Sequence, residues 1–468
     1  MNNSILAIDI GTTNIHAVVA ANDYNNKINI LGIGSGKSEG VQKGHIVDIN
    51  QAGASIKEAV LSAISSSGTS ISKAIVSISG ANTRTIRSVG SINIPSGQIT
   101  HNEIKQVLNM ALYNAKVIPD DDAIHVLPVY FKVDDGSHIL NPLSMNGSRL
   151  EVSVNVITAK KTNLTNVRNA IKQANLEVDK FVLSGYANAI ATLEQDQKKL
   201  GSAVLNVGGS TTQIVVYKGT TLIYNDFLPI GSEHITNDIS VMLHTPYSAA
   251  NMVKNKYGSL LPIKEDDEAN TITKVKLPIL GNEVDSKEIS IAQIQPIIHA
   301  RVEEILTLVN ENLLQSSILD SIDGGIIITG GLAKIPGIKE LASLVFPNLP
   351  VKISNPKNIK NGYIDFNNPT YSTIVGLLLY ELDSHNSFEL DSNKDLISKR
   401  SATQTVKIQQ NIHEQPQQNS NDTNTQKQQP QQTTYSHPMN DLKDLTSIKI
   451  EEKPRKLGSF WKKITEWL

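Results

Sequence analysis

The chain has 468 residues, of which 39% are hydrophobic and 19% are charged, and its formal net charge is −2. This balance excludes the strong basic field of a nucleic-acid-binding protein, and the absence of cysteine excludes disulfide frameworks, cysteine-ligated zinc and thiol chemistry. No apolar run reaches the roughly 18–20 residues of a spanning helix, and the start of the chain lacks the basic region of a secretory signal. We therefore expect no membrane-spanning segment and no secretory signal.

Short β-branched runs alternate with helical patterns and turn residues up to about Asp391, which predicts an α/β fold. Within this part, one pattern occurs twice. The apolar strand Leu6–Ile10 runs into the turn Gly11–Asn14 and then into a second apolar run. In the middle of the chain, Val204–Val207 runs in the same way into Gly208–Thr212. The repeat predicts two similar halves, each with a β-hairpin, that face one another.

The glycine, serine and threonine residues of these turns are suited to holding phosphate. Glycine allows positive φ angles and close approach of the backbone to an anion, while unpaired N–H groups and hydroxyls donate hydrogen bonds to its oxygens. Two such turns that face each other would hold a triphosphate from both sides. Asp9, at the end of the first strand, would lie beside the phosphates and orient a magnesium ion through its water shell, because Mg²⁺ retains several waters.

A third glycine-rich segment follows later in the chain. The apolar run before Gly330-Gly331 predicts a strand that ends in a Gly-Gly turn, and residues 333–338 predict a turn leading into a helix. A glycine pair beside a helix N-terminus forms a slot through which a flat nucleoside passes the backbone without meeting a side chain. Each of these turns alone is ordinary structure, but the three in this order indicate a nucleotide site.

Other catalytic or metal-binding patterns are weaker. The 11 histidines are scattered, without the spacing of a metal-binding or catalytic helix. The acidic runs Asp120–Asp122 and Glu265–Glu268 lack the spaced ligands and the turn glycine of a calcium loop. They are therefore predicted to be solvated loops, with cation binding as the alternative.

From Ser392 to Glu452 the sequence is rich in Gln, Asn, Thr, Ser and Pro and has almost no residues to bury. Such a segment cannot offset the entropy that is lost on ordering, so residues 392–452 are predicted to be a disordered linker. The alternative is a glutamine-rich helix, which the proline and asparagine residues would interrupt.

The last segment, residues 453–468, is predicted to be an amphipathic helix. Apolar side chains recur there with helical spacing, both tryptophans of the chain are among them, and basic residues flank or oppose them. This pattern is typical of a helix in the membrane interface with its tryptophans at headgroup depth. The alternative is a helix that packs back on the folded domain. The residues expected to bind the membrane are Leu457, Phe460, Trp461, Lys462, Lys463, Ile464, Trp467 and Leu468.

The order of these segments resembles that of the actin-like ATPase superfamily: phosphate loop one, an inserted region, a connecting helix, phosphate loop two, an adenosine loop and a final connecting helix. The connecting helices would correspond to Phe181–Ala189 and Tyr371–Tyr380. Within the superfamily, the chain looks most like the FtsA family of bacterial cell-division proteins, over roughly residues 1–390 and the extreme C-terminus. The stretches that carry this resemblance are Ser38–Asp48, Val76–Asn82, Ile124–Pro128, Asn141–Gly147 and Leu228–Ile239.

The resemblance implies an actin-like, two-lobed α/β fold with a duplicated sheet-and-helix core. It also implies an inserted subdomain that contacts neighbouring subunits and other division proteins, and a small lobe that docks the C-terminal peptide of FtsZ. For any single basic residue of that lobe, such as Lys254, Lys256 or Arg301, a solvated face is the simpler interpretation. The implied parts are the first half of the core (1–83), the inserted FtsA-type subdomain (84–159), the connecting-helix region (160–200), the second half (201–229), the small lobe (230–304), the second half with the final connecting helix (305–391), the linker (392–452) and the amphipathic helix (453–468).

The resemblance further implies ATP and Mg²⁺ as cofactors, with Asp9 acting on the metal through water and Lys254, in the segment Ser248–Lys254, reaching the adenosine. Two residues depart from the family pattern: Asn206 replaces an aspartate and Asn251 replaces a glutamate. Because an amide has no negative charge and accepts no proton, we expect ATP binding with at most weak hydrolysis. The residues expected to hold the nucleotide are Asp9, Gly11, Thr12, Thr13, Asn14, Gly208, Gly209, Ser210, Thr211, Thr212, Lys254, Gly330 and Gly331.

The implied function is that of a peripheral protein on the cytoplasmic face of the inner membrane, which polymerises at the division septum and anchors FtsZ filaments there. Its partners would be the FtsZ C-terminal peptide, further copies of itself, the anionic membrane surface and other division proteins, and no nucleic acid. One short helix binds a membrane reversibly, so self-association would have to hold several tails together. Two alternatives share the fold. An actin-like sugar or metabolite kinase would need a catalytic carboxylate, and a pilus-assembly adaptor would lack the membrane helix.

Overall fold

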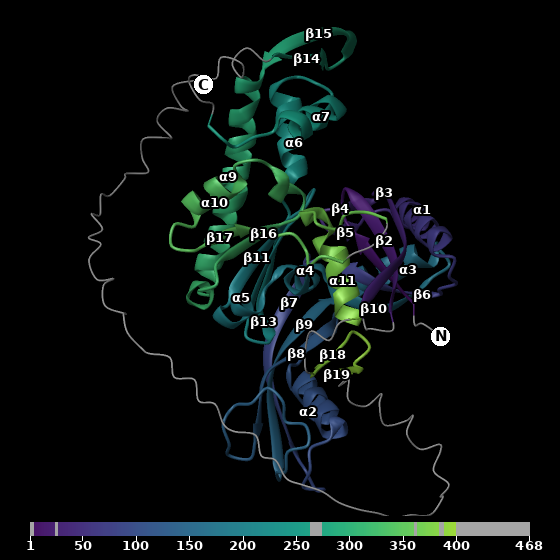
Figure 1. Ribbon diagram of the computed structural model, residues 1–468, viewed down its shortest axis with the longest axis vertical. Helices are drawn as coiled ribbons and strands as arrows, with labels where there is room; N and C mark the ends of the chain where they lie inside the picture. Colours follow the sequence, from purple (N-terminus) through teal and green to yellow (C-terminus); the bar gives the residue numbers. More distant parts are fainter. Residues whose placement is uncertain (1–3, 24–26, 263–273, 360–362, 383–387, 399–468) are drawn as a thin grey trace, which may run out of the picture. The chain divides into compact units, whose positions relative to one another are not determined.

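The computed structural model describes residues 4–23, 27–262, 274–359, 363–382 and 388–398, all within one unit of the chain, Met1–Gln404 (Figure 1). The linker prediction beyond residue 398, the amphipathic-helix prediction for residues 453–468 and the acidic run Glu265–Glu268 lie outside the described residues. None of the helices described is long and apolar enough to cross a lipid bilayer.

The first half of the core is a five-stranded sheet covered by a helix. Its elements are β1 (Ile5–Ile10), β2 (Asn14–Asn22), β3 (Ile28–Lys37), β6 (Lys73–Ile78), β10 (Glu177–Leu183) and α1 (Ile49–Ser67). The strand order is β10-β6-β1-β2-β3, in which β1 and β2 form an antiparallel hairpin and β6 lies parallel to both β1 and β10. Helix α1 lies close to β3, because a Cβ on Gly32 or Gly34 would collide with backbone oxygens of α1.

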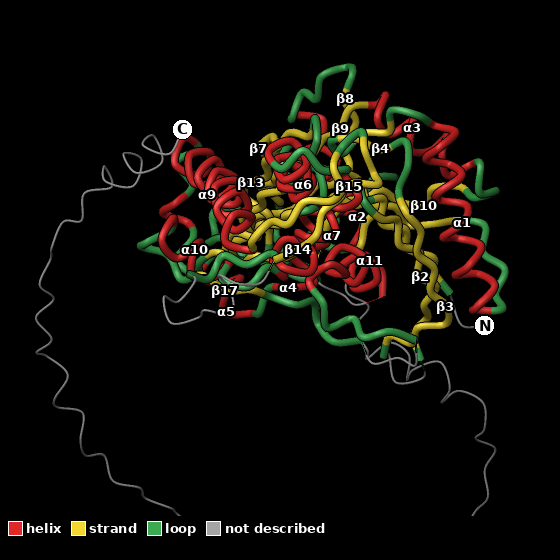
Figure 2. The backbone as a smooth tube through the Cα atoms, turned by 90° about the horizontal axis from the view of Figure 1, so that it is seen from above, coloured by secondary structure: helices red, strands yellow, loops and turns green. Residues whose placement is uncertain are grey.

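The second half of the core repeats this arrangement (Figures 1 and 2). Its elements are β11 (Ser202–Val207), β12 (Thr212–Lys218), β13 (Thr221–Leu228), β16 (Ile326–Thr329), β17 (Val351–Ile353), α9 (Ile291–Gln315) and α10 (Ile338–Val345). The order β13-β12-β11-β16-β17 again places an antiparallel hairpin beside two parallel strands. The two helices and this sheet share one hydrophobic core. The sequence repeat therefore corresponds to a structural duplication, as predicted.

Two helices connect the halves. α4 (Ser184–Thr192) contacts β11 and β12, and α11 (Ser372–Leu382) contacts β1 and β2. They pack closely on each other, because a Cβ on Gly376 would collide with the Ala187 carbonyl. The first predicted connecting helix begins three residues too early. Residues Phe181–Leu183 belong to β10, where pairing with β6 keeps them extended.

The inserted subdomain is a separate sheet with its own core. Its elements are β7 (Thr83–Asn93), α2 (His101–Asn114), β8 (Asp121–Val133), β9 (Arg149–Lys160), β18 (Phe388–Leu390) and β19 (Leu396–Ser398). The order is β19-β18-β8-β9-β7, so the end of the folded chain joins the sheet of the insert. Helix α2 starts with a capping box between Thr100 and Glu103, and Gly90 of β7 gives it room to approach.

The structure corrects two sequence predictions in this region. Residues 392–398 form a turn and strand β19 rather than the start of a linker, because β18 pairs with β8 at Leu390 and Val126 and gives the polar stretch a partner. Asp121, predicted to lie in a solvated loop, is buried at the start of β8. Its carboxylate accepts a hydrogen bond from the Thr158 hydroxyl at 3.1 Å.

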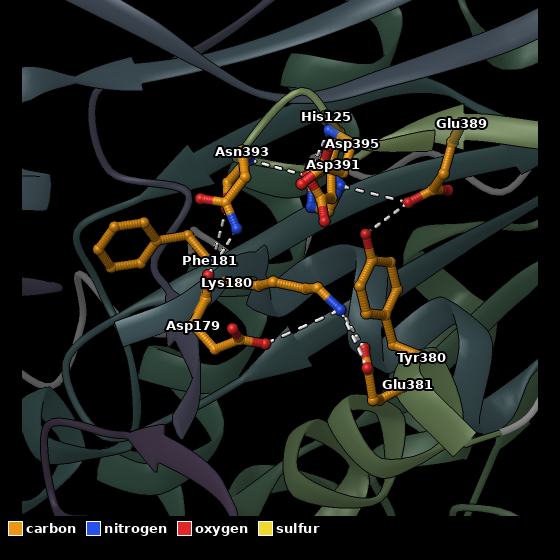
Figure 3. Close-up of polar contacts among 11 residues, drawn as sticks. His125, Asp179, Lys180, Phe181, Tyr380, Glu381, Glu389, Asp391, Asn393 and Asp395 are labelled. Atoms are coloured by element: carbon orange, nitrogen blue, oxygen red, sulfur yellow. Dashed lines mark hydrogen bonds and ion pairs between the residues drawn. The ribbon is translucent and has the colours of Figure 1, made fainter. Parts of the chain in front are cut away.

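A buried polar cluster ties β18 to the connecting helices, and Figure 3 shows its contact between Glu389 and Tyr380 of α11. The fully buried Glu389 carboxylate accepts hydrogen bonds from the hydroxyls of Tyr186 in α4, at 2.9 Å, and Tyr380 in α11, at 2.6 Å. Burial, together with this carboxylate, raises the pKa of both tyrosines well above its usual value, so both remain donors. His125 of β8 lies beside the cluster, and its Nε2 accepts from the Leu183 N–H at 3.1 Å.

The turn between β18 and β19 is held in the same way (Figure 3). Asn393 Nδ2 donates to the Asp179 carbonyl at 2.7 Å, and the Phe181 N–H donates to Ser392 Oγ at 3.0 Å. The Lys394 ammonium donates to a carboxylate of β8 at 3.1 Å. The hairpin β18–β19 thus joins the edge of the first core sheet to the inserted subdomain.

The remaining elements form the small lobe and connections of the core. They are β4 (Val41–Gln42), β5 (His45–Ile46), α3 (Lys161–Lys172), α5 (Gln195–Leu200), α6 (Ser232–Met242), α7 (Tyr247–Tyr257), β14 (Lys274–Ile279), β15 (Asn282–Ser290) and three short 3₁₀ turns, Leu319–Ser321, Gly331–Lys334 and Pro369–Tyr371. α6, α7, the hairpin β14–β15 and the start of α9 make up the small lobe. There Arg301 is bound by Asp238 of α6 at 2.6 and 2.9 Å, so its guanidinium joins α9 to α6.

Candidate nucleotide-binding site

Phosphate loop one is the turn between β1 and β2. The Gly11 N–H donates to the Asn14 carbonyl at 3.1 Å, and a Cβ on Gly11 would lie only 2.6 Å from that oxygen, so the turn requires glycine. The Thr13 hydroxyl donates to the Glu233 carboxylate of α6 at 3.0 Å. Loop one therefore presents its hydroxyls towards the second half of the core.

Phosphate loop two, between β11 and β12, lies directly against loop one. The Gly208 N–H closes this turn with a bond of 2.8 Å. The Ser210 N–H donates to Thr12 Oγ1 at 3.1 Å, and a Cβ on Gly209 would collide with the Thr13 hydroxyl. Loops that lie almost 200 residues apart in the sequence are thus brought within hydrogen-bond distance, from opposite halves.

Some of the residues predicted to hold the nucleotide are already bonded within the fold or lie at the edge of the site. The Thr212 side chain is buried, and its hydroxyl donates to the Ile230 carbonyl at 2.8 Å, so it is already used by the fold. Thr211 is also buried. Asn14 is exposed where β2 begins. The hydroxyls whose hydrogen bonds cross between the halves are those of Thr12, Thr13 and Ser210.

Asp9 is the last residue but one of β1, beside loop one. Its carboxylate accepts a hydrogen bond from Ser77 Oγ at 2.8 Å, and Ser77 Oγ in turn accepts from the Ile10 N–H at 3.0 Å. Burial raises the pKa of Asp9 to about 6, although the Ser77 hydrogen bond opposes this shift. Burial makes the Asp9 carboxylate costly to ionise, and a nearby cation would stabilise the ionised form. The position of Asp9 therefore suits a cation.

The adenosine loop follows β16. Gly330 has a φ of +88°, and a Cβ there would collide with the Asn206 side chain. At Gly331, by contrast, a Cβ would meet only Thr370 Cγ2, at 3.9 Å, so this position borders open space as a nucleoside slot requires. The 3₁₀ turn Gly331–Lys334 separates the glycine pair from α10. The helix N-terminus expected beside the slot therefore lies further along the chain.

Lys254 of α7 lies at the start of α6, whose first residues contact phosphate loop two. Its ammonium donates to the Ser232 carbonyl at 3.1 Å, and burial lowers its pKa while the charge of Glu233 opposes this effect. The Glu233 N–H donates to the Gly209 carbonyl at 2.7 Å. Glu233 was not among the site residues predicted from the sequence. The only local signal is its place in Gly231-Ser232-Glu233, a motif typical of the start of a helix.

Asn206 and Asn251, the two residues that depart from the family pattern, differ in their surroundings. Asn206 lies opposite Gln213 in the β11–β12 ladder, at the position where Asp9 lies opposite His16 in the β1–β2 ladder. The acid of the first half thus has an amide as its structural counterpart in the second. Asn251 lies one turn before Lys254 in α7, where its side chain accepts a weak hydrogen bond of 3.5 Å from Asn255.

Comparison with known proteins identifies the family. The model described as "Cell division protein FtsA" matches residues 203–376, and that described as "SHS2 domain inserted in FTSA" matches residues 80–158. The cell division protein FtsA of Helicobacter pylori (strain ATCC 700392 / 26695) is 33% identical over 416 residues, which cover 83% of this chain and 84% of that protein. The chain belongs to the FtsA family. The Escherichia coli K12 member is 29% identical over 399 residues, covering 83% of this chain and 93% of its own.

Among solved structures, the chain is similar to the "PilM-PilN type IV pilus biogenesis complex", with a TM-score of 0.56 and 16% identity over 81% of this chain and 98% of that one. At this identity the likeness concerns the fold alone. Family membership makes the chain a cell-division protein of actin-like fold, with the SHS2 insert as its third sheet. Neither the kinase nor the pilus-adaptor alternative is favoured.

Proposed function

We propose that the chain binds ATP with Mg²⁺ between the two phosphate loops, as part of an adaptor that anchors FtsZ filaments to the membrane. The observation that carries the nucleotide site is the contact between loops of opposite halves, through Ser210 and Thr12 at 3.1 Å. Their glycines leave room for an anion, and their N–H and hydroxyl groups are suitable donors. A phosphate that enters this contact would replace the direct bond and join the halves.

The residues present fit a hydrated magnesium ion. Among the described residues, no three His, Asp or Glu side chains gather as direct metal ligands, so Asp9 would act on the ion through its waters. Bound Mg²⁺ neutralises phosphate charge. Gly331 and Lys254 would border the nucleoside, and Thr12, Thr13 and Ser210 would donate to phosphate oxygens. Asn206 cannot take a proton from an attacking water, so turnover should be slow.

The nucleotide proposal is tested by calorimetric titration of purified full chain with MgATP, alongside phosphate release. We expect saturable binding, with turnover near the detection limit. Asp9→Ala should weaken MgATP binding, whereas Asp196→Ala, at an exposed position of α5, should not. Absence of binding by the unaltered chain would refute the site. Robust magnesium-dependent ATPase that Asp9→Ala abolishes would refute the slow turnover.

The FtsZ-docking surface proposed for the small lobe is its exposed apolar end. Val241 and Met242, at the end of α6, are 60% and 64% exposed, and Leu280 of the β14–β15 turn is 63% exposed. The turn lies against the residues that follow α6, because the Leu280 N–H donates to the His244 carbonyl at 2.9 Å. An exposed apolar group of this kind suits the hydrophobic face of a short peptide.

Binding of a labelled FtsZ C-terminal peptide to the full chain tests this surface. Met242→Glu should reduce the affinity at least about tenfold, since it places a charge within an apolar contact. Leu344→Glu is the control, because Leu344 is an apolar residue that is even more exposed than Met242 but belongs to α10 of the core. Equal peptide affinity of both variants and the unaltered chain would exclude the surface.

The tether completes the proposed function. The C-terminal residues 453–468 would bind the cytoplasmic face of the inner membrane at the septum, and self-association would add avidity. Co-sedimentation of FtsZ with anionic liposomes, with and without ATP, tests this arrangement. FtsZ should sediment with the full chain and remain in the supernatant with a chain that ends at Ser398. FtsZ recruitment by that shorter chain would contradict the tether.

A further inference from the structure

The short hairpin β4–β5 touches both halves of the core at the phosphate loops. Its tip is Lys43-Gly44, and the Lys43 N–H donates to Ser210 Oγ of loop two at 3.1 Å. On the other side, Gly44 lies against Ser79 of the first half, where any Cβ would collide with the serine hydroxyl. The tip is therefore a third element at the loops, which sequence analysis did not select as part of the site.

The base of this hairpin is fixed. The Gly40 carbonyl accepts hydrogen bonds from the N–H groups of Val47 and Asp48, at 2.8 and 3.1 Å, and thereby closes the segment. Asp48 also caps α1 through the N–H groups of Asn50 and Gln51. Because base and tip are both held, the hairpin presents the Lys43 side chain from a defined place.

The hairpin explains the backbone conformation of Lys43 but not the position of its charge. Its φ of +46°, followed by +77° at Gly44, is the left-handed conformation that both central residues of a two-residue hairpin turn adopt, so the turn itself accounts for the backbone. The Lys43 side chain is exposed, and in the part of the chain that is described its ammonium has no ion pair or hydrogen bond. Nearby Lys37 differs, because it forms an ion pair with Glu39 at 3.3 Å. An exposed, unpaired cation that a tight turn holds beside the phosphate loops suggests an anionic partner.

The position of the tip indicates which phosphate it would meet. The pocket below the hairpin is lined by Ile10, Gly44, His45, Ser77 and Ser79, on the Asp9 side of the site. The nucleoside slot at Gly331 is built by different segments, the ends of β16 and of the 3₁₀ turn before α11. The tip therefore lies towards the phosphate end of a bound nucleotide.

We propose that the Lys43 ammonium binds the terminal phosphate of ATP, and that the β4–β5 tip distinguishes ATP from ADP. This inference rests on the proposed ATP site. A lysine ammonium supplies a mobile point charge with three donors, and hydrogen bonds between charged partners are about twice as strong as neutral ones. The backbone bond from Lys43 to Ser210 would at the same time join the hairpin to loop two, so the third phosphate would also hold the halves together.

The test is calorimetric titration of the full chain with MgATP and with MgADP. Lys43→Ala should weaken ATP binding at least about tenfold and change ADP binding much less, while Lys43→Arg should retain most of the preference for ATP. Lys37→Ala, at an exposed lysine one strand earlier, is the control and should leave both affinities unchanged. Amide hydrogen exchange of residues 41–46 provides a second readout. ATP should protect this segment more than ADP does in the unaltered chain, and Lys43→Ala should remove the difference.

The outcomes separate the two proposals. If the unaltered chain binds no ATP, the proposed nucleotide site fails and this inference fails with it. If it binds ATP but Lys43→Ala binds ATP equally well, only the role of Lys43 is overturned. Equal weakening of ATP and ADP binding, with a lowered melting temperature, would likewise overturn it, because that result assigns Lys43 to the stability of the loop.

Discussion

Asp9 makes the nucleotide-free protein sensitive to pH. Its folded-state pKa of about 6 lies above the ordinary value of 3.8, so the folded protein binds the proton more tightly than the unfolded chain. The ionised carboxylate therefore costs stability, a cost that is absent below about pH 3.8 and fully present above about pH 6. The contribution of Asp9 to the free energy of unfolding therefore falls as the pH rises from about 3.8 to about 6.

Asp9→Asn should consequently stabilise the nucleotide-free protein. We expect a gain of about 1–3 kcal/mol in the free energy of unfolding at pH 7.5, at the low end if solvent reaches the partly exposed side chain. The gain should shrink towards pH 5. Urea denaturation at both pH values measures it, with Asp196→Asn as the exposed control. A destabilised Asp9→Asn variant at pH 7.5 would contradict the assigned burial cost.

Asn206→Asp is the corresponding test of the missing acid. Because Asn206 lies beside Gly330 at the counterpart of the Asp9 position, an aspartate there would orient water and metal from the second half. Magnesium-dependent phosphate release should rise about tenfold or more over the unaltered chain. Asn255→Asp, an exposed change on α7, is the control. Unchanged turnover would show that Asn206 is not what limits hydrolysis.

The residues that sequence predicts well are those whose role is local. Gly11 and Gly209 are recognisable because a tight turn or a close approach requires glycine, and the repeat marks both loops. Glu233 and Lys43 are not recognisable in this way. Their contacts join segments from opposite halves, and only the packed fold brings such segments together.

At the scale of elements, the hairpin β18–β19 should be essential to the folded unit. A chain that ends at Ser398 should keep the stability of the folded part, whereas one that ends at Asp391 loses the contacts of Ser392, Asn393 and Lys394. We expect the shorter chain to lose about 2–4 kcal/mol of unfolding free energy, since several partly buried polar partners become unsatisfied. Chemical denaturation of both chains measures this. Equal midpoints would show that the hairpin adds nothing.

Sequence patterns predict the core elements because their apolar runs are long and end in glycine turns. The strands β18 and β19 have only three residues each, separated by a polar turn, so no periodicity indicates them. Their partner, β8, lies more than 250 residues earlier in the chain. Such a strand exists only through its tertiary pairing, which is why the predicted linker began too early.

At the scale of the whole molecule, membrane attachment should depend on the apolar face of residues 453–468. Trp461→Ala combined with Ile464→Glu should abolish co-sedimentation with anionic liposomes, because it removes an interfacial anchor and adds a repelled charge. Thr465→Ala, off the apolar face, is the control. Binding by the unaltered chain should also weaken as salt is raised. Undiminished binding by the double variant would reject this segment as the anchor.

The duplicated architecture could be predicted from the sequence because two similar strand-turn-strand motifs flank an insert. The way in which the insert is joined to the core could not. It depends on Glu389, whose carboxylate is buried against tyrosines from both connecting helices, and an isolated acid near the end of a predicted fold gives no sign of that role.

The same hairpin determines how a pulling force on the tail would act. β19 is the edge strand of its sheet, and its last residue, Ser398, pairs with Phe388, the first residue of β18. Tension at Ser398 would therefore load one pair at a time and unzip β19 from its open end, which takes less force than shearing all pairs together. The contacts of Lys394 lie at the far end and would be loaded last. A membrane-bound chain under load would yield at β19 before its nucleotide site was deformed.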